Sequence, residues 1–123
     1  PDDGACSLAR TVRDAHGGGD TDYFEKHRDR DTGEVSVTPR DVDVAGRDVV
    51  VVDDIVSTGS TMAQAVGALD GPARVFVACV HPLLVEDAHT KLERAGVERV
   101  VGTDTVERVV SRVSAAPAVA AEL

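Results

Sequence analysis

The chain has 123 residues, a formal net charge of −9, one Tyr, two Phe and no Trp. This length predicts one domain with an aliphatic core, because chains near this size bury about two-thirds of their unfolded surface. The acidic balance excludes nonspecific nucleic-acid binding, which needs a basic surface. The apolar runs are of strand length, so no membrane span is expected, and we expect a cytoplasmic protein.

The charged residues have an unusual composition. Lys26 and Lys91 are the only lysines beside eleven arginines, and fifteen aspartates outnumber seven glutamates. High acidity with little lysine predicts a salt-rich cytoplasm, as in halophilic archaea, where salt screens the self-repulsion of an acidic surface. An acidic protein from a genome of high GC content is the alternative.

The first part of the chain predicts one helix and two short strands. Residues 3–16 have apolar side chains at helical spacing and end at three glycines. Residues 22–24 are a strand candidate, and residues 25–33 are expected to form a charge-dense polar loop. Val35 and Val37 alternate with polar residues, which indicates a half-exposed strand.

The rest of the chain alternates apolar strands with helices. We expect strands at 49–52, 74–80 and 97–101, helices at 62–69 and 84–95 between them, and a short tail. This alternation is the α/β pattern. It predicts a parallel sheet with helices on both faces.

The segment VVVVDDIVSTGST, residues 49–61, is the most informative part of the chain. Consecutive valines predict a strand buried on both faces, and ligands of open α/β sheets bind at the carboxyl ends of strands. A Gly-containing hydroxyl loop at a helix N-terminus offers N–H groups to a phosphate. Asp53 and Asp54 would repel that phosphate, so we expect them to hold sugar hydroxyls. An ordinary strand-turn-helix with a Ser/Thr N-cap is the alternative to this ribose 5-phosphate site.

The same segment resembles the PRPP-binding signature shared by type I phosphoribosyltransferases and ribose-phosphate pyrophosphokinases (PRPP synthetases). Four flanking segments are similar to PRPP synthetases in particular: PDDGA, EKHR, ACVHPLL and the ending from VGTDT to AAEL. The form of the EKHR loop most resembles archaeal members. The resemblance implies that residues 1–123 are a phosphoribosyltransferase-like α/β domain, the C-terminal half of a PRPP synthetase whose N-terminal half is absent. The opening at Pro1, in what looks like a turn, agrees with a fragment.

The resemblance implies transfer of the diphosphoryl group of ATP to O1 of ribose 5-phosphate, giving PRPP and AMP, with Mg²⁺ as cofactor. Lys26 and Arg28 would be the catalytic residues, since alternate side chains of an extended loop point the same way. Asp2 would be a metal ligand; its alternative is helix capping, for which Asp3 is the expected residue. The implied ribose-5-phosphate-binding residues are Arg28, Asp53, Asp54, Thr58, Gly59, Ser60, Thr61 and Met62.

The resemblance also implies a homo-oligomer, at least a dimer, with ATP and ribose 5-phosphate as substrates. The absent half supplies much of the ATP pocket, so we expect the isolated chain to bind ribose 5-phosphate weakly and to turn over poorly or not at all. One alternative is a phosphoribosyltransferase that uses PRPP, although residues 103–123 show no base-binding hood. The other is a non-catalytic, PRPP-synthetase-like regulatory subunit, against which Lys26 and Arg28 argue.

Four further residues have simpler interpretations. Cys79 and the distant Cys6 have no metal-binding or redox spacing, and Cys79 is expected in the core. His81 ends a strand and is expected to have a structural or site-edge role. Lys91 is expected on the solvated face of a helix.

Overall fold

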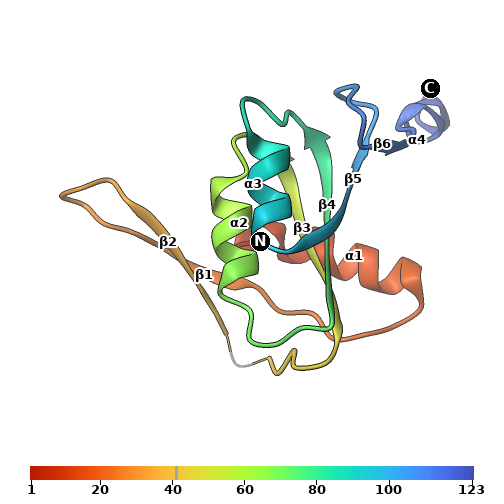
Figure 1. Cartoon of the computed structure of the whole chain (residues 1–123). Helices are drawn as coiled ribbons and strands as arrows, with labels where there is room; N and C mark the ends of the chain where they lie inside the picture. Colours follow the sequence, from red (N-terminus) through yellow and green to blue (C-terminus); the bar gives the residue numbers. More distant parts are fainter. Residues whose placement is uncertain (41) are drawn as a thin grey trace.

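The computed structural model describes residues 1–40 and 42–123. A short 3-10 helix and α1 are followed by a hairpin and then by an alternating series of strands and helices (Figure 1). In chain order the elements are η1 (Asp3–Ala5), α1 (Cys6–His16), β1 (Phe24–Arg28), β2 (Val35–Pro39), β3 (Asp48–Val56), α2 (Ser60–Gly67), β4 (Arg74–Pro82), α3 (Ala88–Arg94), β5 (Val97–Thr103), β6 (Ser111–Val113) and α4 (Ala116–Ala121). Within the described residues, no helix is long and apolar enough to cross a membrane.

The main sheet has four parallel strands in the order β3-β4-β5-β6. Val51 pairs with Val77, and Val77 pairs with Val100, so apolar side chains of neighbouring strands form rows across the sheet. Helices α2 and α3 connect successive strands, as parallel pairing requires. The prediction of an α/β fold with a parallel sheet is confirmed.

The core lies between this sheet and the two helices α2 and α3. Met62 and Leu92, one from each helix, are among the largest fully buried side chains, together with Val77 of β4. Helix α1 lies on the other side of the sheet, beside β3 (Figure 1). That face is less covered: Val50 is 50% exposed there, and a cavity of about 470 Å³ separates it from α1.

Residues 25–33 do not form the loop that we expected. Residues 24–28 form β1, which pairs antiparallel with β2, placing Lys26 opposite Val37 and Arg28 opposite Val35. The Asp29 carboxylate closes the turn by accepting the N–H groups of Asp31 and Thr32, at 2.8 and 2.9 Å. Backbone hydrogen bonds hold the β1–β2 hairpin together. Because its charged side chains are exposed to solvent, they do not prevent the strands from pairing.

Helix α3 begins later than predicted. Leu84 and Glu86 have positive φ angles of 45° and 57°, in the left-handed region that interrupts a right-handed helix. The Leu84 N–H donates to the Val56 carbonyl at 3.0 Å, and the Val85 N–H donates to the Ser57 carbonyl at 3.2 Å. The first predicted turn of the helix therefore binds the end of β3 instead.

The strand and tail boundaries also differ from the prediction. Strand β3 continues to Val56, so Asp53 and Asp54 lie within its carboxyl-terminal half. The expected tail contains β6 and α4. Asp104 fastens this tail, because its carboxylate accepts the Ala115 N–H at 2.8 Å and the Ser114 hydroxyl at 2.7 Å.

Candidate functional site

The loop between β3 and α2 presents an open helix N-terminus. Gly59 is the N-cap of α2, with φ of 74° and with no side-chain cap hydrogen bond in the described residues. The first intrahelical bond runs from the Ala63 N–H to the Gly59 carbonyl at 2.8 Å, so the preceding N–H groups, from Ser60 to Met62, have no partner within the helix. A Cβ at residue 59 would lie 3.2 Å from the Ala88 carbonyl oxygen. Both the left-handed conformation and this close contact therefore favour glycine.

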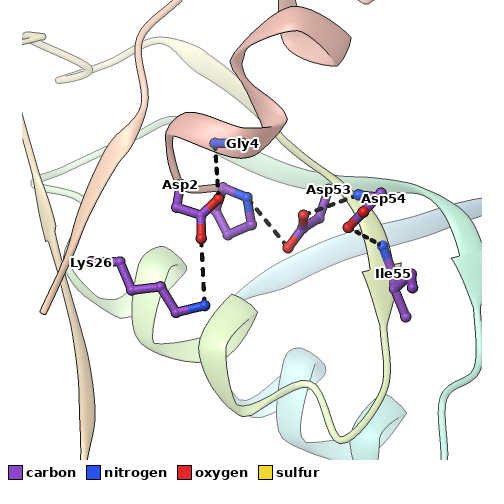
Figure 2. Close-up of polar contacts among 7 residues, drawn as sticks. Asp2, Gly4, Lys26, Asp53, Asp54 and Ile55 are labelled. Carbon is purple, nitrogen blue, oxygen red and sulfur yellow. Dashed lines mark hydrogen bonds and ion pairs between the residues drawn. The ribbon is translucent and has the colours of Figure 1, made fainter. Parts of the chain in front are cut away.

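The two acidic residues of β3 have different surroundings. The Asp53 side chain is 20% exposed, and its Oδ2 lies 3.3 Å from the Pro1 nitrogen (Figure 2). Burial raises the pKa of Asp53, an effect that the hydrogen bond from the Asp54 N–H partly opposes. Asp54 is exposed, and its Oδ1 accepts the Ile55 N–H at 2.8 Å. Asp54 is therefore the carboxylate more accessible to a ligand.

Asp2 and Lys26 meet beside these acids. Asp2 Oδ1 accepts the Gly4 N–H at 3.1 Å, and Asp2 Oδ2 lies 3.4 Å from Lys26 Nζ (Figure 2). The Pro1 carbonyl accepts the Phe24 N–H at 2.8 Å, which fastens the chain start to the base of β1. Asp2 thus caps η1, a role that we expected for Asp3.

The described residues include no group of three or more His, Cys, Asp or Glu that could hold a metal ion. A single carboxylate is nevertheless a suitable ligand for Mg²⁺, which keeps several waters and binds through substrate phosphates. Asp2 Oδ2 is the oxygen suited to this, because its partner is a lone Lys26 ammonium rather than a backbone N–H. The site therefore fits a metal shared with phosphate oxygens and not a cage made by protein alone.

Arg28 lies farther out on the hairpin than Lys26. It is exposed and lines a shallow hollow with Asp29, Glu34 and Ser36. In the described part of the chain, no hydrogen bond or ion pair joins Arg28 to Asp2, to Asp53 or to the loop before α2. The structure brings Lys26 to the site, and the role of Arg28 stays a prediction.

Lys91 also contacts the loop before α2, which its sequence pattern did not indicate. Its side chain is 32% exposed, and Nζ donates to the Thr58 carbonyl at 3.1 Å and to Ser60 Oγ at 3.2 Å. Its helical position among charged neighbours predicted a solvated face instead. One signal could have identified it: it is one of only two lysines in the chain.

Cys79 and His81, both in β4, have surroundings that indicate structural roles. Cys79 is buried in the core; burial, with the nearby Asp53 charge adding to it, raises the pKa of this thiol to about 11, so the thiol is neutral near pH 7. His81 Nδ1 lies 2.8 Å from Thr105 Oγ1, which joins the end of β4 to the segment after β5.

The chain is similar to known proteins over almost its whole length. A family model described as "Phosphoribosyl transferase domain" matches residues 2–114. Over 120 residues the chain is 62% identical to a ribose-phosphate pyrophosphokinase of Halobacterium salinarum, covering 98% of this chain and 42% of the relative. It is 50% identical over 123 residues to the ribose-phosphate pyrophosphokinase of Methanothermobacter thermautotrophicus, again covering 98% of this chain and 42% of the relative.

A solved structure is similar as well. The crystal structure of phosphoribosylpyrophosphate synthetase from Mycobacterium smegmatis superposes with a TM-score of 0.69 at 29% identity, covering 99% of this chain and 41% of that one. The chain thus spans about two-fifths of the length of the relatives that it matches. The predicted resemblance to ribose-phosphate pyrophosphokinases is confirmed, and the family match shows that the chain belongs to the phosphoribosyl transferase domain family.

Proposed function

We propose that this chain binds ribose 5-phosphate as part of a ribose-phosphate pyrophosphokinase. The observation that carries the proposal is the open N-terminus of α2 at Gly59, directly after a strand that carries Asp53 and Asp54. An open helix N-terminus favours a phosphate, because its N–H groups and its dipole are both directed at the ligand. Carboxylates a few residues away favour the hydroxyls of an attached sugar. The names of the relatives support the same substrate.

The binding roles follow from the positions of the groups. The N–H groups from Ser60 to Met62 and the hydroxyls of Thr58, Ser60 and Thr61 would hold the 5-phosphate. Asp54, exposed at the end of β3, would accept hydrogen bonds from the ribose hydroxyls, with Asp53 beside it. Hydrogen bonds to a charged group contribute about 1.5–3 kcal/mol each, so a few of them can give measurable affinity.

The proposed reaction is ATP + ribose 5-phosphate → PRPP + AMP. The sugar O1 forms a bond to the β-phosphorus and loses its hydroxyl proton to solvent, and the bond from that phosphorus to the oxygen that leaves with AMP breaks. Lys26 and Arg28 would neutralise charge on the transferred group, which is the main requirement of phosphoryl transfer. Mg²⁺, when bound through Asp2, would neutralise phosphate oxygens. Lys26 must leave Asp2 Oδ2, now 3.4 Å away, for both roles to be filled.

We further propose that the chain is the C-terminal half of that enzyme and that it works as at least a dimer. The chain covers only 42% of its Halobacterium salinarum relative, which supports a half of the enzyme, whereas the dimer follows only from the resemblance to PRPP synthetases. Much of the ATP site would then be supplied by the other half. The 123-residue chain should therefore bind ribose 5-phosphate but release little AMP from ATP.

The test is calorimetric titration of ribose 5-phosphate into the chain at molar KCl with Mg²⁺. Asp54→Asn should weaken binding by about tenfold, since about 1.4 kcal/mol of hydrogen bonding to a charged acceptor is lost. Asp70→Asn, which removes an exposed acid at the opposite end of the sheet, should leave binding unchanged.

Three outcomes would contradict the proposal. Absence of heat from a folded sample would mean that the loop and the acids do not make the site. Consumption of PRPP with a free base would favour the phosphoribosyltransferase alternative. Robust AMP production by the chain alone would contradict the proposed dependence on another half.

A further inference from the structure

The phosphate loop, residues 57–61, is braced by a separate segment, residues 84–91. Two backbone bonds connect them at one end, from Leu84 to the Val56 carbonyl at 3.0 Å and from Val85 to the Ser57 carbonyl at 3.2 Å. In the middle, Gly59 packs against the backbone of Ala88. The left-handed conformations at residues 84 and 86 allow the chain to make these contacts before α3 begins. Such costly conformations persist where the surrounding structure fixes them, often at functional sites.

Lys91 makes the third contact between the two segments. Among the described residues of segment 84–91, it has the only charged side chain that forms hydrogen bonds with the loop. Its Nζ lies 3.1 Å from the Thr58 carbonyl oxygen and 3.2 Å from Ser60 Oγ. Asp87, one turn earlier in sequence, lies 3.5 Å from the same Nζ and helps to fix the ammonium in place. With 32% of its side chain exposed, Lys91 is more restrained than a freely solvated lysine.

We infer that Lys91 is a positioning residue for the phosphate loop, which fixes the Thr58 carbonyl and orients the Ser60 hydroxyl toward a bound phosphate. This inference rests on the proposed function and deepens it, because it assigns a residue to the same site. It does not make Lys91 a direct ligand of the phosphate.

The orientation follows from counting donors and acceptors. A lysine ammonium has three donors and no acceptor, so Ser60 Oγ must accept from Lys91. Thr58 Oγ1 donates to the same Ser60 oxygen at 3.3 Å. A hydroxyl has two lone pairs and one hydrogen. Both lone pairs are thus engaged, and the remaining capacity of Ser60 is to donate its hydrogen, which is what a phosphate oxygen requires.

The charge of Lys91 strengthens this effect. A hydroxyl that accepts from a cation becomes a stronger donor, because hydrogen bonds in a chain polarise one another. The ammonium also offsets the nearby carboxylates of Asp53 and Asp54, which oppose a phosphate. A neutral residue at position 91 would supply neither contribution.

The test is a double-mutant cycle on ribose 5-phosphate binding, measured by calorimetry. Lys91→Met should weaken binding by about tenfold, in the range expected for one charged hydrogen bond. Arg94→Met is the matched control: it removes the same charge from the same helix, at an exposed residue, and should change binding less than twofold. Ser60→Ala should weaken binding as Lys91→Met does. The double variant should bind no more than about twofold more weakly than either single variant, because coupled residues are not additive.

A second measurement needs no ligand. In the free chain, Lys91→Met should shift the backbone amide NMR signals of residues 58–61, whereas Arg94→Met should not. If Lys91→Met fails to fold, Lys91→Gln replaces it, since glutamine keeps a donor without the charge and should give an intermediate loss of affinity.

The outcomes separate this inference from the proposed function. If wild type binds ribose 5-phosphate and Lys91→Met binds like Arg94→Met, the inference is wrong while the proposed function stands. If the losses of Lys91→Met and Ser60→Ala multiply to about a hundredfold, Lys91 acts on the phosphate directly and not through Ser60. If wild type does not bind at all, the proposed function fails and the inference fails with it.

Discussion

Two glycines, one at the start of α2 and one near the end of β5, show how strongly a single Cβ matters in this fold. At Gly59 the backbone is left-handed and lies against Ala88. At Gly102 the backbone is ordinary, but a Cβ would lie 2.6 Å from Cγ and 2.9 Å from Cβ of Pro82, which is fully buried. Strands β4 and β5 can approach each other at this point only because residue 102 has no side chain.

Gly102→Ala should therefore destabilise the chain by about 1–3 kcal/mol, the usual cost of inserting a methyl group into a packed core. The measurement is the free energy of unfolding in urea. Gly67→Ala is the control, because a Cβ there has nothing within 4 Å, and alanine favours the helix that this residue ends. Equal stability of both variants would show that Pro82 can move aside without cost.

Sequence predicts the relative placement of residues best where they lie close together in the chain. Asp53, Asp54 and the loop from Thr58 to Met62 fall within ten residues, and the structure places the acids near the end of β3 and the loop at the start of α2, as their order predicted. Their binding roles stay a prediction. Lys91 was missed because its contact with Thr58 spans 33 residues. The periodicity of a helix indicates which of its faces is buried, but not which distant loop lies against that face.

At the scale of elements, the tail after β5 depends on one carboxylate. Hydrogen bonds from the Ala115 N–H and the Ser114 hydroxyl stabilise ionised Asp104 and hold its pKa below the ordinary value of 3.8. Together with the Asp104 N–H, which donates to the Val113 carbonyl at 2.9 Å, they hold the end of β6 and the start of α4 in place.

The Asp104 interaction should show in the pH dependence of stability. A carboxyl whose folded-state pKa is depressed contributes stability above the unfolded pKa and loses it as pH falls through the folded pKa. Asp104→Ala should therefore lower the urea midpoint at pH 7, and the difference from wild type should disappear as the pH falls below 3.8. Glu122→Ala, in the same tail, is the control and should leave the midpoint unchanged. A difference that persists at low pH would mean that the carboxylate charge is not responsible.

The elements that the sequence predicted well are those with their own periodicity. Strands β3, β4 and β5 and helix α2 were expected near their observed positions because apolar residues define them. The strand expected at residues 22–24 lies at Phe24–Arg28 instead, because its side chains are mainly charged and its stability comes from backbone pairing with β2. The start of α3 was predicted too early because residues 84 and 86, which are left-handed, are not glycines. Their residue types therefore did not indicate a break in the helix.

For the whole molecule, the acidic surface dominates the response to salt. With a net charge of −9, the folded chain repels itself, and salt should relieve this repulsion as the Debye length falls from about 10 Å at 0.1 M to about 3 Å at 1 M. The Halobacterium salinarum relatives are in keeping with such a surface, and adaptation of this chain to salt stays a prediction.

We expect the Tm to rise by about 4 °C or more between 0.1 M and 2 M KCl, which corresponds to roughly 1 kcal/mol for a chain of this size. A variant that neutralises three exposed acids, Asp31→Asn, Asp70→Asn and Glu122→Gln, should show a smaller rise. An equal rise in both proteins would assign the effect of salt to apolar burial instead of to charge.

The strand order has a consequence for synthesis of the chain. Each strand of the main sheet pairs with the next one in sequence, so the sheet can grow strand by strand as the chain leaves the ribosome, with short loop closures that favour fast folding. The phosphate loop and its bracing segment lie between β3 and the end of α3. The loop that we propose to hold the phosphate can therefore take its final shape while β5, β6 and α4 are still being made.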